Sequence, residues 1–97
     1  MTGYLLSPAA QADPGYIWDY SARTWGEQQA DRYVLGIRDA CSALADGRAR
    51  GRAIDAIRPG YRKLAVASHF LFYRDTDAGL IEVIRILHQR MDTEAHL

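Results

Sequence analysis

The sequence predicts an α+β fold in which a helical hairpin covers one face of a small, mainly antiparallel sheet, in the order β-α-α-β-β-β. A short apolar run, GYLLS, comes first, and two helical segments that meet at Gly26 follow it. Three further apolar runs, at residues 61–67, 69–74 and 80–88, are separated by turn residues. Helices grouped together and strands grouped together are typical of α+β proteins.

The first strand and the first helix meet at Ser7-Pro8. Ser7 is a favourable N-cap, and Pro8 suits the first helical position because its missing N–H would have no partner there. Helical residues continue to about residue 25, where Gly26 ends the helix. The triplet Asp13-Pro14-Gly15 interrupts them, since proline removes a backbone hydrogen bond. We expect either a helix that begins after Asp13, with Asp13 as a second cap, or a helix kinked at Pro14.

The second helix, over residues 27–45, is the clearest element. Its apolar residues recur every three or four positions, as one face of an amphipathic helix requires; they are Ala30, Tyr33, Val34, Ile37, Cys41 and Leu44. Cys41 is therefore expected to be buried. It is the only cysteine, so no internal disulfide can form, and a reducing cytoplasm is the expected compartment.

Residues 46–60 are rich in glycine and arginine and are expected to form a loop that ends at the turn Arg58-Pro59-Gly60. The next two apolar runs predict a hairpin with a tight turn near Ala67-Ser68. DTDAG predicts a second turn, and the β-branched run LIEVIRILH predicts an interior strand.

The chain of 97 residues is expected to form one domain, residues 1–97. Its formal net charge is zero, but residues 48–74 hold seven arginine and lysine residues against a single acid, Asp55. Such a segment attracts nucleic acid or an acidic protein segment, or is a solvated basic loop. No apolar run is long enough to span a membrane, and the N-terminus lacks the features of a secretory signal.

The chain resembles the ParE toxins of the RelE/ParE superfamily. The matching stretches are YLLSPAAQAD, IWDYSARTWGEQQADRY, IRPGYRKLAVASHFLFYR and EVIRILHQRMDTEAHL. Pro14-Gly15 departs from the leucine and polar residue of the family pattern, which bears on the straightness of the first helix. The resemblance implies the toxin of a type II toxin–antitoxin system, neutralised by a ParD-like antitoxin. ParE-like proteins poison DNA gyrase, whereas their RelE-like relatives cut mRNA on the ribosome.

A ribonuclease needs a base, an acid and cations beside the scissile phosphate. The candidates are Arg74, Arg85 and His88. Strand alternation places Arg85 and His88 on opposite faces unless a bulge intervenes, and Lys63 is the only lysine. We therefore expect no catalysis, with a RelE-like ribosome-dependent endoribonuclease as the alternative. Arg85 is expected to pair with a carboxylate or a partner, and His69 to be structural.

A binding protein is thus the favoured interpretation. The antitoxin is expected to contact Arg48, Arg50, Arg52, Arg58 and Arg62, and gyrase to contact Trp25, His88, Arg90, Met91, Asp92, His96 and Leu97. Trp18 and Trp25 are expected to pack in the core or to serve as exposed anchors. The tail after the last strand is expected to be too polar for the core. No residue pattern indicates a metal or a cofactor, and neither membrane association nor sequence-specific nucleic-acid binding by the toxin alone is expected.

Overall fold

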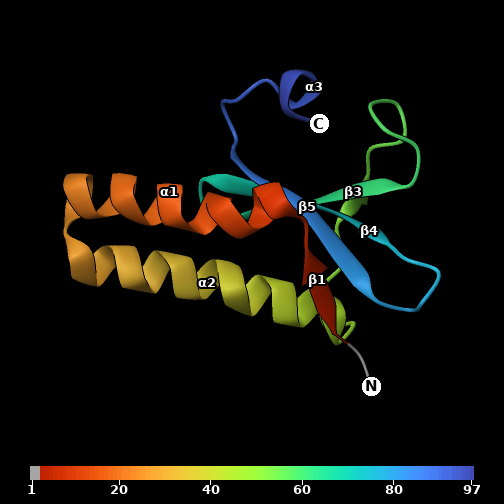
Figure 1. Ribbon diagram of the computed structural model, residues 1–97, viewed down its shortest axis with the longest axis horizontal. Coiled ribbons are helices and arrows are strands. Elements are labelled where there is room, and N and C mark those ends of the chain that lie inside the picture. The colour runs from red at the N-terminus through yellow and green to blue at the C-terminus, as the bar shows by residue number, and fades with distance from the viewer. Residues whose placement is uncertain (1–2) are drawn as a thin grey trace.

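The computed structural model describes residues 3–97 (Figure 1). Its elements are β1 (Tyr4–Leu6), α1 (Pro8–Trp25), α2 (Glu27–Ala45), β2 (Arg52–Ala53), β3 (Tyr61–Val66), β4 (His69–Asp75), β5 (Ile81–His88) and α3 (Thr93–His96). The predicted α+β class and the order of the main elements are confirmed. Two short elements were not predicted: β2, inside the expected loop, and α3, inside the expected tail.

The sheet has the strand order β1-β5-β4-β3-β2. β1 runs parallel to β5, and the other neighbours are antiparallel, so the sheet is mainly antiparallel as predicted. The two long helices lie side by side along one face of the sheet, and the end of the hairpin near Gly26 projects beyond the sheet (Figure 1). Among residues 3–97, no helix has the length and apolar character needed to cross a membrane.

Helix α1 begins as predicted, because the Ser7 hydroxyl accepts the N–H of Ala10 at 3.1 Å and Pro8 occupies the first turn. The helix then runs unbroken through Pro14. The expectation that it begins after Asp13, with Asp13 as a cap, is therefore wrong. Partners on β5 hold the Asp13 carboxylate instead, as described below.

Two apolar clusters lie on the two faces of the sheet. The larger one, between the hairpin and the sheet, contains the predicted α2 stripe except Ala30, including the buried Cys41, together with Leu71, Tyr73, Val83 and Ile86. Burial raises the pKa of the Cys41 thiol to about 11. The smaller one contains Ile54, Phe72 and Leu87.

A bulge in β5 changes which of its residues share a face. Phe72 pairs with Arg85, but the next residue of β4, Tyr73, pairs with Val83, so Ile84 is the extra residue. Val83 and Arg85, which strict alternation places together, therefore do not share a face. The bulge lies before both Arg85 and His88, so these two still leave the strand on opposite sides, as predicted.

Candidate functional site

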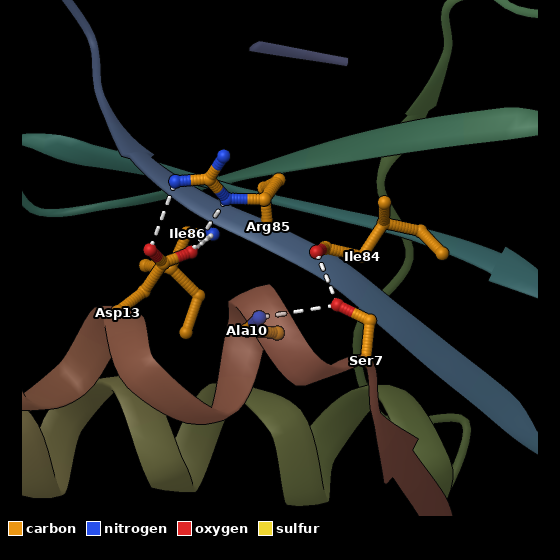
Figure 2. A network of polar contacts seen from close by, with 6 residues as sticks. All are labelled: Ser7, Ala10, Asp13, Ile84, Arg85 and Ile86. Atoms are coloured by element: carbon orange, nitrogen blue, oxygen red, sulfur yellow. Dashed lines mark hydrogen bonds and ion pairs between the residues drawn. The ribbon is translucent and has the colours of Figure 1, made fainter.

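The edge of β5 that faces α1 is completed by side chains. β1 pairs only with Ile81–Val83, which leaves the following backbone groups of β5 without a neighbouring strand. The Ser7 hydroxyl donates to the carbonyl oxygen of Ile84 at 2.6 Å, and the Asp13 carboxylate accepts the N–H of Ile86 at 2.8 Å (Figure 2). Helix α1 and its N-cap residue thus supply the partners that a longer β1 would have supplied.

Asp13 also binds the side chain of Arg85 (Figure 2). Nε and Nη2 of Arg85 each lie 3.0 Å from an Asp13 carboxylate oxygen, a bidentate pair. The Asp13 side chain is 7% exposed and that of Arg85 25%. Hydrogen bonding to Asp13 raises the pKa of the Arg85 guanidinium. Asp13 is the carboxylate partner that the sequence led us to expect for Arg85.

A groove of about 500 Å³ lies between α1 and the end of β5. Ile17, Ile86 and Leu87 contribute apolar lining, and the exposed side chains of Tyr16, Tyr20 and Met91 also border it. Its polar lining consists of the Asp13–Arg85 pair with His69, His88 and Arg90. The groove therefore combines an aromatic and apolar wall with a group of nitrogen-bearing side chains.

The two histidines of the groove are neighbours on adjacent strands. His69 pairs with His88 in the sheet register, and their rings meet edge to face with centroids 5.2 Å apart. The Tyr33 hydroxyl of α2 lies 2.6 Å from Nδ1 of His69 and accepts the N–H of Ser68 at 2.9 Å. Burial lowers the pKa of His69, and the neighbouring His88 lowers it further, while Asp13 acts in the opposite direction.

Exposed aromatic side chains continue from the groove along α1. Tyr16 is 72% exposed, Tyr20 58% and Trp25 59%, and the rings of Tyr20 and Trp25 meet edge to face at 6.1 Å. Core packing of Trp25 is therefore excluded, and the alternative of an exposed anchor fits its position at the projecting end of the hairpin. Trp18 is partly buried and donates its indole N–H to Asp31 of α2 at 2.8 Å.

The seven residues expected to contact gyrase fall on different parts of the surface. His88, Arg90 and Met91 line the groove, and Trp25 lies at the far end of the aromatic row. Asp92 caps α3 by accepting the N–H of Glu94, and His96 is exposed. Leu97 packs against the apolar cluster on the opposite face of the sheet.

The expectation that the tail is too polar for the core is consequently wrong for Leu97. The turn of α3 brings this residue back over the sheet, where it contacts the cluster of Ile54, Phe72 and Leu87. The Arg58 guanidinium donates to the carbonyl oxygen of Leu97 and holds the tail there. The composition of the tail did not predict this contact, because Leu97 is a single apolar residue that follows a polar stretch.

The five arginines expected to bind the antitoxin differ in their surroundings. Arg50 and Arg52 are exposed, and neither side chain forms a hydrogen bond or ion pair within residues 3–97. Arg48 bonds Asp46 at 3.0 Å, and Arg62 donates to the carbonyl oxygen of Gly51 at 2.9 Å. Together with the bond from Arg58 to Leu97, these contacts leave Arg50 and Arg52 as the arginines most available to a partner.

The three residues considered for a ribonuclease do not come together. Arg74 donates to Glu82 at 2.8 Å, and Glu82 lies six residues before His88 on β5, roughly 20 Å along an extended strand. Arg85 and His88 do line one groove, because the long Arg85 side chain crosses the free edge of β5. The structure adds His69 beside His88, with Tyr33 of α2 next to His69. The register of β4 against β5 and the packing of α2 place them there, so the sequence carried no direct signal.

Within residues 3–97, no group of three histidine, cysteine, aspartate or glutamate side chains is arranged to hold a metal ion.

Comparison with known proteins gives a consistent result. The family described as the ParE toxin of the type II toxin–antitoxin system parDE matches residues 4–93. Toxin ParE1 of Mycobacterium tuberculosis is 52% identical over 94 residues, which cover 97% of this chain and 96% of the relative. Toxin ParE1 of Caulobacter vibrioides is 40% identical, covering 100% of this chain and 99% of the relative. A chain of the chromosomal ParDE system of P. aeruginosa has a similar fold, with a TM-score of 0.77 at 23% identity over 91% of this chain and 96% of that chain.

Proposed function

The chain belongs to the ParE toxin family of type II toxin–antitoxin systems, and from this we propose that it inhibits DNA gyrase and is neutralised by a ParD-like antitoxin. The observation that carries the proposal is the relationship to ParE toxins over nearly the whole chain. Gyrase is the target that the ParE resemblance implies, and the cytoplasm is then the site of action. The toxin would act by binding and not by catalysis.

The exposed aromatic row and the groove beside it support a binding mechanism. Large side chains are exposed along α1 at Tyr16, Tyr20 and Trp25, and the exposed Met91 lies beside them at the groove. Aromatic residues in such positions supply much of the binding energy at protein interfaces. We assign this surface to gyrase.

Purified gyrase and supercoiled plasmid provide the test. The folded toxin is expected to inhibit supercoiling and to produce linear plasmid, the product of gyrase trapped on cleaved DNA. The double variant Trp25→Ala/Met91→Ala is expected to lose at least tenfold in potency, because each change removes exposed contact area of the hot-spot type. The matched control is Leu35→Ala, which removes a comparably exposed apolar side chain (53%) from α2 and leaves potency unchanged. No inhibition by the folded wild-type chain rejects the proposal.

The antitoxin is proposed to bind as an acidic segment at the basic loop. Arg50 and Arg52 offer unpaired charges there, and the adjacent edge of the sheet is open, because β2 pairs only with Arg62 and Lys63 of β3. An extended segment can add a strand to the remainder of that edge. Arg50→Gln/Arg52→Gln is expected to slow association severalfold and to leave dissociation nearly unchanged. The control is Arg38→Gln, which changes an exposed arginine on α2. Equal association rates for the two variants would reject the proposal that the basic loop binds the antitoxin.

A second candidate function is that of a RelE-like endoribonuclease, and one observation supports it. His69 and His88 lie in contact beside Arg85, and two imidazoles with a cation can serve as base, acid and phosphate ligand. The distance of Arg74 from this group and the absence of further lysines favour gyrase inhibition. Cleavage of mRNA on translating ribosomes, lost in His88→Ala, would establish the second candidate.

A further inference from the structure

We propose that the polar end of the groove, formed by His69, Arg85, His88 and Arg90, is an anion site that receives an aspartate or glutamate side chain of the protein that the toxin inhibits. The identity of that protein rests on the proposed function, whereas the site follows from the geometry of the groove.

The hydrogen bonds of the two histidines indicate which ring nitrogens remain available as donors. The backbone N–H of Arg90 donates to Nδ1 of His88 at 3.1 Å, so neutral His88 carries its proton on Nε2. The Tyr33 hydroxyl accepts the N–H of Ser68 and lies 2.6 Å from Nδ1 of His69. In the tautomer in which this hydroxyl donates to Nδ1, neutral His69 also carries its proton on Nε2. Both rings line the groove, and each retains one N–H donor without a partner in residues 3–97.

The charged groups nearby favour an incoming anion. Nε and Nη2 of Arg85 bind Asp13, which leaves Nη1 as a further donor, and Arg90 adds a second, exposed cation. The one anion of the groove, Asp13, accepts three hydrogen bonds from Arg85 and Ile86, so its charge is already compensated. Among the described residues that line the groove, the polar end thus offers several donors, and its carboxylate is already engaged.

The walls of the groove indicate a protein carboxylate and not a nucleic-acid phosphate. Ile17, Leu87 and Met91 line the groove together with two tyrosines, which suits an acidic residue flanked by apolar ones. Binding along a phosphate backbone relies on a series of cations, whereas this groove is lined by two arginines, one of them paired. Charge complementarity and apolar lining together select an acidic, partly apolar peptide segment.

Binding at this site must depend on pH. His69 faces Asp13 of α1, Tyr33 of α2 and His88 of β5, and Arg85 and Arg90 line the same groove. Burial lowers the pKa of His69, so this ring is neutral in the free protein near pH 7. A bound carboxylate stabilises the imidazolium form and raises the pKa. The affinity should therefore rise as the pH falls from about 7.5 to 6, with uptake of a proton on binding.

Nitrogen-15 NMR of the histidine side chains tests the site on the intact chain. Sodium acetate and inorganic phosphate are titrated separately at constant ionic strength, at pH 6.5 and 7.5. Acetate is expected to shift His69 and His88 saturably, more tightly at pH 6.5, while the exposed His96 of α3 serves as an internal control. His88→Gln is expected to weaken acetate binding about tenfold, the effect of losing one charge-assisted hydrogen bond. Tyr33→Phe is expected to shift the tautomer balance of His69.

Three results overturn the inference: no saturable shift with acetate, equal shifts at His96, or phosphate binding more than tenfold tighter than acetate, which indicates a nucleic-acid backbone as the occupant. Because these measurements need only the wild-type chain, poor folding of a variant does not affect them. The titration contains no gyrase. If the toxin binds acetate but does not inhibit gyrase, the anion site stands and the proposed function is rejected. If the toxin inhibits gyrase but does not bind acetate, the proposed function stands and the anion site is rejected.

Discussion

The Asp13–Arg85 pair should be the most sensitive polar contact of the fold, and Asp13→Asn tests this. The change removes the charge that accepts two hydrogen bonds from Arg85 and one from Ile86. Removing one partner of a buried ion pair costs about 3–5 kcal/mol. Arg85 can recover some hydration because its side chain is 25% exposed, and the asparagine oxygen can still accept one N–H. We therefore expect the free energy of unfolding to fall by about 3 kcal/mol.

For a domain of this size, such a loss lowers the thermal midpoint by roughly 12–24 °C. Urea denaturation followed by circular dichroism gives the free energy directly. The matched control is Asp19→Asn, the same change at an exposed position of the same helix, for which we expect less than about 0.5 kcal/mol. A double-mutant cycle with Arg85→Met should show a coupling energy of at least about 1 kcal/mol. A loss below about 1 kcal/mol in Asp13→Asn, with no coupling, would refute the reasoning.

Four further predictions concern the packing and ionisation of single residues. Gly51→Ala should destabilise the chain by at least about 2 kcal/mol, because the new Cβ would lie 2.4 Å from a carbonyl oxygen of β3. The control, Gly36→Ala in α2, places its new Cβ with no atom within 4 Å and should stabilise the chain by up to about 1 kcal/mol. Equal urea midpoints for the two variants would contradict the packing around Gly51. Cys41, whose pKa is raised to about 11, should resist iodoacetamide at pH 8 in the native state and react in urea, as mass spectrometry would show. Because the pKa of His69 is lowered in the folded state, the unfolded chain binds a proton at this residue more readily. The contribution of His69 to stability is therefore complete above about pH 6.5 and is lost as the pH falls through its folded pKa. His69→Gln should flatten the dependence of the urea midpoint on pH. Leu97→Ala should lower the free energy of unfolding by about 1 kcal/mol, and no change would mean that the tail does not pack in solution.

The main elements of the fold could be predicted because their signals are local. The Ser7-Pro8 cap, the stop at Gly26 and the stripe of α2 depend on residues a few positions apart, and all three have their predicted roles. β2 was not predicted because a strand of two residues shows no periodicity in the sequence. It is recognised as a strand only by its pairing with β3. The bulge at Ile84 lies in a uniform β-branched run, where no residue type marks it.

The candidate site was harder to predict because distant residues build it. Asp13-Pro14 resembles a local cap, but donors on β5 more than 70 residues away hold the carboxylate. His88 was singled out from the sequence, whereas its neighbour His69 depends on the register of β4 and β5. Trp25 could be placed on α1, yet its exposure follows from the projection of the hairpin beyond the sheet.

The completion of the β5 edge by the start of the chain also bears on when a newly made chain can form the groove. β1 pairs in the sheet only with β5, and the bond from Ser7 to Ile84 joins residues 77 positions apart. During synthesis the helical hairpin can form early, because its contacts are local. The groove cannot form until β5 has left the ribosome, since β5 provides Arg85, Ile86 and His88. A chain whose synthesis stops before β5 therefore lacks the groove, which is part of the surface proposed to bind gyrase.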